Sequence, residues 1–290
     1  MIGVEEKTKG EYQNGCRVYV EPIGGLCNRM RVIASAYQLI RPQHGKLIVK
    51  WTANEELNCP AKALFSLPRG IRVVDVTGED SLAAKLAYYR LRLGYRHRVG
   101  NDQVMKLKQA GNLIPQDKTY YETCETFHRD SRDVDCSIFT PAPELEAQAR
   151  EKIKKITQGG THRVIGLHIR RTDHSVSIRQ SPTELFCRVL ETRLKEDSDT
   201  RFYLATDDAA VRQFFADKYN QDGEIVFFND SETLGRDTAE GIRAAFVELL
   251  TLSMTRRIYG SCGSSYTDMA AAIGHIPLDY VTLDAMEGIL

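Results

Sequence analysis

The sequence contains 290 residues, of which 42% are apolar and 27% are charged, and its 39 Lys and Arg residues balance 39 Asp and Glu residues. This composition is typical of a soluble globular protein and excludes a largely disordered chain. Because the net charge is zero, no overall field draws the protein to nucleic acid or to an anionic membrane, and any anionic ligand must be held by a local group of residues.

The cysteines and the apolar segments indicate the compartment. Seven cysteines lie scattered without CxxC pairs, and an odd number does not suit a complete disulfide framework. No segment reaches the roughly 18 consecutive apolar residues of a membrane-spanning helix. We therefore expect a soluble, cytoplasmic protein without a transmembrane segment.

Short β-rich runs alternate with helical patterns in the first half of the chain. Strands are predicted at residues 17–20, 47–51 and 72–76, and a helix is predicted at 28–40. This alternation is typical of βαβ units with parallel strands.

The same alternation resumes in the second half. Strands are predicted at 164–170, 202–206, 225–228, 257–261 and 277–281, and helices near 183–195, 208–219, 238–255 and 264–273. Between the halves, Pro141 and Pro143 precede a helical pattern, which indicates a join within residues 140–160. We predict two α/β domains, 1–155 and 156–290, with ligand sites in the turns that follow their strands.

The strand at 164–170 leads into the run HIRRTD, residues 168–173. A guanidinium offers a planar fork of donors that matches phosphate oxygens, so Arg170 and Arg171 suit a diphosphate, and such an arginine could stabilise a leaving nucleoside diphosphate without a metal. The alternative is that Arg171 and Asp173 are surface charges and that His168 is a core histidine.

Three further turns carry chemically useful residues. Asp207 and Asp208 end the strand at 202–206, where paired carboxylates suit either a helix cap or a metal ion. Ser264 and Ser265 begin a helix, where free amides and hydroxyls suit an anion or an ordinary cap. The run GGLCNRMR at 24–31 lacks the GxGxxG spacing of a dinucleotide site.

Together, these motifs resemble the fucosyltransferase superfamily. HIRRTD is similar to the arginine motif of the α1,6-fucosyltransferases, which include nodulation enzymes, and FYLATDD and the Ser264 turn are similar to their second and third motifs. GGLCNR resembles the first loop of α1,2- and protein O-fucosyltransferases. The likeness covers residues 163–275 well and 17–51 loosely.

This resemblance implies an α/β, GT-B-like fold of two Rossmann-type parallel-sheet domains, an N-terminal one on the acceptor side and a C-terminal one that binds the donor. It implies an inverting, metal-independent hexosyltransferase that moves fucose from GDP-fucose to a hydroxyl of a glycan, glycolipid or protein. GDP-fucose is then the donor substrate and no separate cofactor is required. The Golgi lumen is the alternative compartment for such an enzyme without its anchor.

The resemblance also assigns roles to residues. Arg170 is expected to contact the β-phosphate, Arg171 to orient the site and His168 to lie near the guanosine. Glu248 falls where the α1,6 enzymes carry an aspartate that reads guanine, although it could instead be a solvent-facing helical residue. The other donor contacts expected are Gly24, Gly25, Asp207, Asp208, Ser264, Ser265 and Tyr266.

The catalytic base departs from the family pattern. After the arginine motif this chain reads HSVSIRQSPTE, with no acid before Glu184, where the α1,6 enzymes carry a glutamate. Asp173 is one candidate for the base. Asn28 is the other catalytic candidate, because an asparagine could orient the acceptor hydroxyl.

Other functions remain as alternatives. GDP-mannose or another nucleotide sugar could be the donor, and the chain could be a catalytically silent nucleotide-sugar binding protein. Residues 85–98, KLAYYRLRLGYRHR, interleave basic and aromatic residues as single-stranded nucleic acid sites do. We instead expect a helix with its Leu and Tyr side chains in the core, or part of an acceptor groove, and no nucleic-acid partner.

Overall fold

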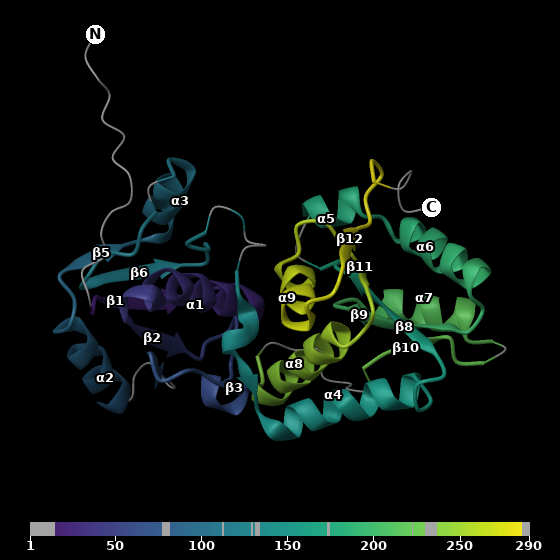
Figure 1. The fold of residues 1–290 in the computed structure, drawn as a ribbon, viewed down its shortest axis with the longest axis horizontal. Coiled ribbons are helices and arrows are strands. Elements are labelled where there is room, and N and C mark those ends of the chain that lie inside the picture. Colours follow the sequence, from purple (N-terminus) through teal and green to yellow (C-terminus); the bar gives the residue numbers. More distant parts are fainter. Residues whose placement is uncertain are drawn as a thin grey trace, which may run out of the picture. The chain divides into compact units, whose positions relative to one another are not determined.

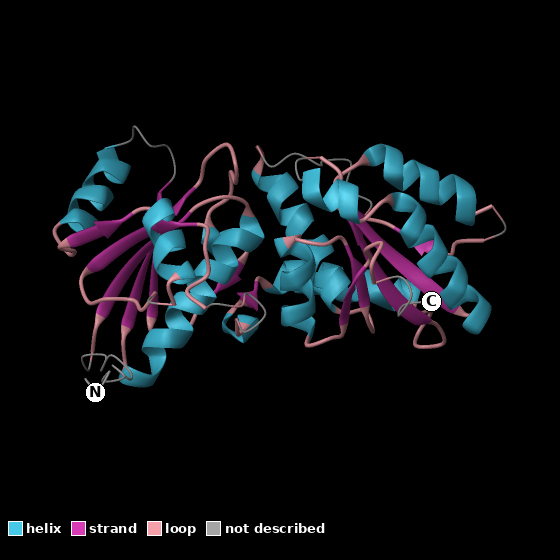
Figure 2. Ribbon diagram, turned by 90° about the horizontal axis from the view of Figure 1, so that it is seen from above, coloured by secondary structure: helices cyan, strands magenta, loops and turns pink. Residues whose placement is uncertain are grey.

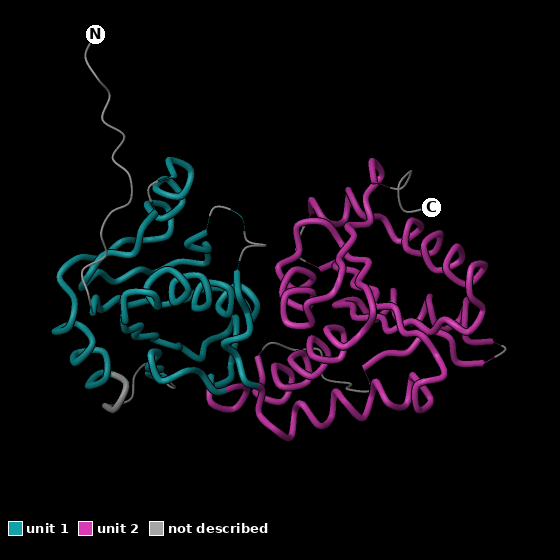
Figure 3. The backbone as a smooth tube through the Cα atoms, in the orientation of Figure 1, with its two compact units in different colours: residues 1–61, 66–140 teal, residues 62–65, 141–290 magenta. Residues whose placement is uncertain are grey.

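The computed structural model describes residues 15–76, 82–111, 113–128, 130, 134–172, 175–221, 223–229 and 237–285. Strands and helices alternate along these residues (Figures 1 and 2). The chain divides into unit 1, Met1–Ala61 and Ser66–Thr140, and unit 2, Lys62–Phe65 and Pro141–Leu290 (Figure 3). Each unit contains a five-stranded sheet.

The sheet of unit 1 is parallel, with the strand order β4-β2-β1-β6-β5. Its strands are β1 (Arg17–Pro22), β2 (Lys46–Thr52), β4 (Ile71–Val76), β5 (His97–Val99) and β6 (Thr119–Thr123). The three strands predicted for this half are confirmed as β1, β2 and β4. Because β1 lies at the centre, the loop that follows it emerges from the middle of the sheet edge, where α/β proteins place their ligands.

Three helices pack with the sheet of unit 1: α1 (Leu26–Ile40), α2 (Leu82–Arg92) and α3 (Asn101–Gln109). Helix α1 is buried over most of its surface and packs against β1 and β2, which agrees with its mostly apolar sequence. Short 3-10 turns lie at η1 (Arg41–Gln43), η2 (Ala61–Ala63) and η4 (Cys136–Ile138).

The prediction for residues 85–98 was partly wrong. The segment begins as helix α2, as expected, but Leu86, Tyr88, Tyr89 and Leu93 are exposed. Leu91 and Tyr95 are buried, and they pack with Tyr19, Ile48 and Tyr120 in one apolar cluster. One narrow stripe of this amphipathic segment therefore meets the sheet, and the remaining aromatic and basic side chains face solvent.

The sheet of unit 2 repeats the same architecture in the order β10-β9-β8-β11-β12, again with parallel strands. Its strands are β8 (Arg163–Ile169), β9 (Thr200–Thr206), β10 (Val226–Phe227), β11 (Ile258–Gly260) and β12 (Leu278–Tyr280). The five strands predicted for the second half are confirmed. Strands β3 (Phe65–Ser66) and β7 (Thr140–Pro141) pair separately.

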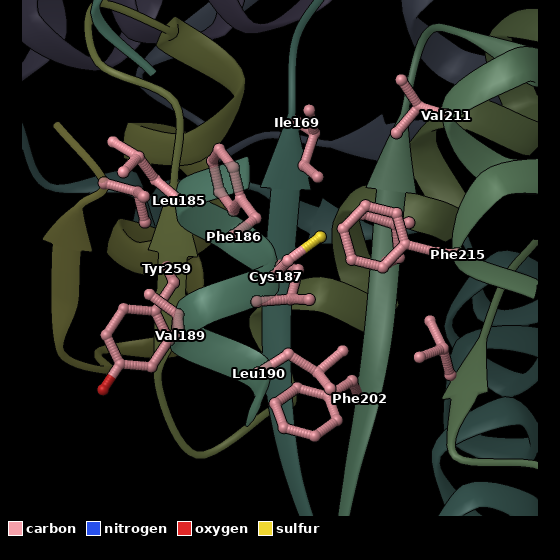
Figure 4. Close-up of a cluster of buried hydrophobic side chains, with 14 residues drawn as sticks. Ile169, Leu185, Phe186, Cys187, Val189, Leu190, Phe202, Val211, Phe215 and Tyr259 are labelled. Carbon is pink, nitrogen blue, oxygen red and sulfur yellow. The ribbon is translucent and has the colours of Figure 1, made fainter. Parts of the chain in front are cut away.

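The helices of unit 2 are α4 (Pro143–Ile156), α5 (Ser175–Gln180), α6 (Thr183–Glu196), α7 (Ala209–Tyr219), α8 (Ala239–Ser253) and α9 (Ser265–Gly274). Of these, α6, α7, α8 and α9 contact the strands of the sheet. Alternate residues of β8 show the two faces. Leu167 and Ile169 join a core cluster with apolar side chains of α6 and α7 (Figure 4). Gly166 points to the other face, where an added Cβ would lie 2.6 Å from Leu252 of α8. Since side chains alternate along a strand, His168 points to this second face as well.

The main segment of unit 2 starts at Pro141, which lies within the join expected at residues 140–160. It starts before residue 156, the first residue of the second domain as predicted, and so unit 2 includes α4. Helix α4 packs along α8, and Glu144 lies 3.3 Å from the guanidinium of Arg243. A proline in its first turn and lysines in its last turn favour the start and the end of this helix, whichever unit it packs on. A boundary drawn from sequence alone could not show on which unit this helix packs.

All seven cysteines lie in the described part of the chain, and none of them forms a disulfide there. Five of them are buried. Within the described residues, every helix is too short or too polar to span a bilayer.

Candidate functional site

The turns after β8, β9 and β11 lie together at one edge of the second sheet. Strand β8 is central, with His168 aligned to Ala205 of β9 and to Gly260 of β11. The carboxyl ends of parallel strands meet at the same edge, so three of the motifs singled out in the sequence meet there too. These are HIRRTD, ATDD and GSCGSSYTD.

His168 is held in the interior of this site. Its side chain is 6% exposed, and Nδ1 lies 2.5 Å from the Thr267 hydroxyl. Burial lowers the pKa of His168 to about 4, helped by the charges of Arg170 and Arg171 and opposed by Asp207. The imidazole is therefore neutral near pH 7, and His168 contributes a flat ring to the site but no charge.

Close packing of α9 on β11 brings Thr267 to His168. A Cβ on Gly260 would lie 2.1 Å from the Thr267 side chain, so only glycine fits at the end of β11. The backbone is tied down as well, because Ser261 N donates to His168 O at 2.9 Å.

Tyr266 links His168 to Glu248. The Tyr266 and His168 rings stack, with centroids 4.9 Å apart and planes inclined by 26°. The Tyr266 hydroxyl donates to Ala245 O at 2.9 Å and to Glu248 Oε2 at 3.1 Å. Burial raises the pKa of Glu248 to about 7, despite the hydrogen bond from Tyr266. The structure thus joins three residues from different elements that the sequence suggested separately.

The two neighbouring arginines have different surroundings. The Arg171 guanidinium donates to Ser181 O at 2.8 Å, to Thr183 Oγ1 at 2.9 Å and to Arg170 O at 2.8 Å. These bonds tie the turn after β8 to the start of α6. Arg170 is part-buried, and its backbone N–H donates to Ser261 Oγ at 3.1 Å. Asp173, the next candidate of this motif, lies outside the described residues.

Asp207 and Asp208 organise the protein backbone. Asp207 accepts from Arg171 N and from the Thr172 hydroxyl, both at 2.7 Å. Asp208 is the N-cap of α7, as the sequence predicted, and accepts from Ala210 N at 2.8 Å. Among the described residues, no group of three or more His, Cys, Asp or Glu side chains could hold a metal ion.

The amino end of α9 combines free amides with a buried hydroxyl. Ser264 is the N-cap residue by position, but its side chain makes no capping bond. It is 0% exposed, and its Oγ has no hydrogen-bond partner within the described part of the chain. An unpartnered buried hydroxyl is costly, so a site of this kind points to a polar ligand. Gly263 turns the chain into the helix with φ of 71°.

The remaining candidates lie in unit 1, in the loop after β1. Gly24 has φ of 85°, and its N–H donates to Glu56 Oε2 at 3.0 Å. Gly25 is the N-cap residue of α1, and Asn28 lies part-buried in its first turn.

Arg29 holds this loop in place and was missed by the sequence reasoning. It is 1% exposed, donates to Gly24 O at 2.7 Å and to Asn54 Oδ1 at 2.7 Å, and also donates to Thr52 O. Burial lowers the pKa of Arg29 to about 10, which leaves it charged. Its position inside GGLCNRMR was the available signal.

Other missed residues are Thr267, Ser261, Ser181 and Thr183, which hold the motif side chains and backbone of unit 2. Thr267 lies within a motif that the sequence singled out. Ser181 and Thr183 carry no signal in the sequence, because their role depends on where α6 begins relative to β8.

No protein-family model matches the chain. Solved structures that share its fold include NodZ α1,6-fucosyltransferase co-crystallised with GDP, with 16% identity, a TM-score of 0.60 and coverage of 89% of this chain and 92% of that one. NodZ from Bradyrhizobium matches with 15% identity, a TM-score of 0.63 and coverage of 94% and 96%. POFUT1 in complex with GDP-fucose matches with 8% identity, a TM-score of 0.54 and coverage of 93% and 99%.

The chain therefore has the α/β fold of these fucosyltransferases, with two parallel sheets of five strands each. The GT-B-like fold expected from the motifs is confirmed. At this level of identity the comparison establishes the fold, and the chemistry has to be argued from the site.

Proposed function

We propose that the protein is a fucosyltransferase-like glycosyltransferase that takes fucose from GDP-fucose by an inverting, metal-independent reaction. The observation that carries this proposal is the Ser264 hydroxyl, which is buried without a partner at the amino end of α9, beside the contacts that join Tyr266, His168 and Glu248. The fold is that of enzymes solved with GDP or GDP-fucose.

The amino end of α9 suits the diphosphate. The first amides of a helix have no partner within the helix, and the helix dipole favours negative charge there. The Ser264 hydroxyl adds one donor, and Arg170 would supply the charge opposite the β-phosphate. Negative charge grows on GDP as it leaves, so these donors would stabilise the transition state more than the bound substrate.

Glu248 and its neighbours suit the guanine base. A carboxylate can accept hydrogen bonds from the N1 and N2 edge of guanine, whereas uracil lacks this pair of donors. The Tyr266 ring, which stacks on the buried and neutral His168, lies next to this carboxylate. GDP binding would favour the deprotonated form of Glu248, which the free protein holds only partly near pH 7.

The transfer step would be a single displacement. The acceptor oxygen forms a bond to the anomeric carbon while the bond from that carbon to the β-phosphate oxygen breaks, and GDP leaves with the electron pair. The acceptor proton passes to a base. Asp173 stays a prediction for that base, and Asn28 stays a prediction for orienting the acceptor hydroxyl. The acceptor is proposed only as a hydroxyl of a glycan, glycolipid or protein.

Calorimetric titration with GDP, UDP, GDP-fucose and GDP-mannose tests the proposal. We expect GDP and GDP-fucose to bind and UDP to bind at least tenfold more weakly, because the lost guanine contacts are worth at least about 1.4 kcal/mol. Binding of none of the four would contradict the whole proposal.

Turnover then separates the remaining alternatives. Release of GDP from GDP-fucose in the presence of an acceptor would establish an enzyme, whereas binding without turnover on a broad acceptor panel would indicate a silent nucleotide-sugar binding protein. Turnover with GDP-mannose but not with GDP-fucose would show that the enzyme uses a different donor sugar.

A further inference from the structure

A cavity with a volume of about 740 Å³ lies within unit 1, apart from the candidate site of unit 2. It opens at the amino-terminal ends of β1, β2 and β4 and is bounded by the end of α2. The glycine-rich loop follows the carboxyl end of β1, so the length of that strand, roughly 16 Å at 3.3 Å per residue, separates it from the cavity. Neither the donor contacts nor the loop residues of the proposed function line this cavity.

Five cationic side chains line the cavity: Arg17, Lys46, Arg69, Arg72 and Arg90. Among the described residues, no acidic side chain lines it, and none of the five cationic side chains forms an ion pair with another of these residues. The carboxylate of Asp117 lies nearby, but it accepts from the backbone N–H of Arg17.

The sheet register gathers three of these charges on one face. Arg17 of β1 is aligned with Lys46 of β2, and Arg72 of β4 is aligned with Ile48, two residues further along β2. Aligned residues point to the same face, and so do residues two apart on one strand. Like charges that are neighbours across strands are destabilising, so this arrangement costs stability unless an anion compensates it.

The floor of the cavity is apolar. Tyr19, Ile48 and Leu91 line it, and all three belong to one buried cluster. The turn after α2 passes directly over Tyr19, because a Cβ on Gly94 would lie 2.2 Å from the Tyr19 hydroxyl. Apolar and cationic side chains in one cavity suit a compact ring that carries several anionic groups.

We propose that this cavity binds a sugar-sized polyanion with two or more phosphate or sulfate groups. Its volume lies within the usual range for small-molecule sites, roughly 300 to 1,000 Å³. Guanidinium groups hold phosphate and sulfate oxygens through paired hydrogen bonds, and the aromatic and aliphatic floor packs against the C–H face of a sugar ring.

Binding of two probes tests this site. Fructose 1,6-bisphosphate represents a phosphorylated sugar and a trisulfated heparin disaccharide represents a sulfated one, each titrated at physiological ionic strength. We expect at least one of them to bind, and the tighter one identifies the source of the anionic groups. Lys46→Gln and Arg72→Gln should each weaken that binding about tenfold, the usual worth of one charge-assisted hydrogen bond.

Arg41→Gln is the matched control, because it removes the same charge from the same unit. Arg41 is exposed and does not line the cavity. This substitution should leave the affinity unchanged. Equal weakening by all three variants would show a non-specific charge effect and overturn the proposal. Loss of binding in Arg170→Ala, with no loss in the cavity variants, would show that the anion binds in unit 2. That result would overturn the proposal as well.

Thermal unfolding gives a second readout that does not depend on turnover. Without ligand, Lys46→Gln should raise the melting temperature, because it removes one of two aligned like charges, and the probe should then raise it less than in the unsubstituted protein. A single-stranded oligonucleotide that binds more tightly than both probes and loses affinity in the cavity variants would assign the surface to nucleic acid instead.

Discussion

Arg170 and Arg171 carry the same side chain in adjacent positions, but their hydrogen-bond partners differ. The Arg171 guanidinium donates hydrogen bonds to two backbone carbonyls and to the Thr183 hydroxyl, at the turn after β8 and the start of α6. Arg170 uses its backbone to meet Ser261. The sequence assigned phosphate contact to Arg170 and orientation to Arg171, and the bonds of Arg171 agree with a positioning role.

Substitution of each arginine should therefore have a different effect. Arg170→Ala should reduce transfer by about a hundredfold or more, the usual cost of losing one oxyanion donor, while the melting temperature stays near that of the unsubstituted protein. Arg171→Ala should lower the free energy of unfolding by about 1 to 3 kcal/mol, because buried acceptors lose their donors. Thermal unfolding and initial rates measure the two effects. Near-normal turnover by Arg170→Ala would remove the main support for the mechanism.

Glu248 should make GDP binding depend on pH. Its pKa of about 7 in the free protein means that the carboxylate needed for guanine forms as the pH rises. We expect GDP affinity at pH 6 to be about tenfold weaker than above pH 8, since one pH unit below the pKa leaves about a tenth of the groups ionised. Titrations across this range measure the effect.

Glu248→Gln should bind GDP weakly at every pH, and Glu240→Gln, an exposed change on the same helix, should keep the pH dependence. The unliganded protein should also lose stability as the pH rises from 4.5 to about 7, because the folded state keeps a proton that the unfolded state releases. A flat pH profile for GDP binding by the unsubstituted protein would contradict the guanine-reading role.

At the scale of elements, the amino ends of α8 and α9 differ although both begin with a hydroxyl residue. Thr238 caps α8 by accepting from Gly241 N at 3.0 Å. Ser264 makes no such bond at α9, and its buried hydroxyl has no hydrogen-bond partner among the described residues. Of these two helices, the one without a side-chain cap lies at the candidate site.

Alanine at these two positions should act in opposite directions. Thr238→Ala should lower the free energy of unfolding by about 1 kcal/mol, the usual cost of a lost cap. Ser264→Ala should raise it by a similar amount, roughly 1 kcal/mol, because an unsatisfied buried hydroxyl is removed, and should weaken GDP binding about tenfold. Denaturant unfolding and calorimetry measure both. A stabilised Ser264→Ala protein with unchanged GDP affinity would show that the hydroxyl does not bind the donor.

At the scale of the whole molecule, activity should not require a divalent cation. Asp207 and Asp208 each bind backbone groups of unit 2, so this pair is already occupied in organising turns. We expect the rate of transfer to stay unchanged after dialysis against EDTA. Loss of the rate, with recovery on adding Mn²⁺, would return the pair to the metal role that the sequence left open.

The sequence by itself determined the strands, the parallel architecture and the order of the motifs. Strands such as β8 and β9 were predictable because each is a short apolar run between helical patterns, which is a property of neighbouring residues. Asp208 was a candidate for the cap of α7 because a cap also depends on neighbouring residues, here an aspartate directly before a helical pattern.

Only the tertiary structure decided how these pieces meet. The stacking of Tyr266 on His168, the contact of Glu248 with Tyr266 and the packing of α4 with unit 2 join residues far apart in the sequence. The cationic cavity depends in the same way on the register between β1, β2 and β4. Such contacts depend on which helix packs on which face of a sheet. The local sequence pattern of each element does not specify that packing.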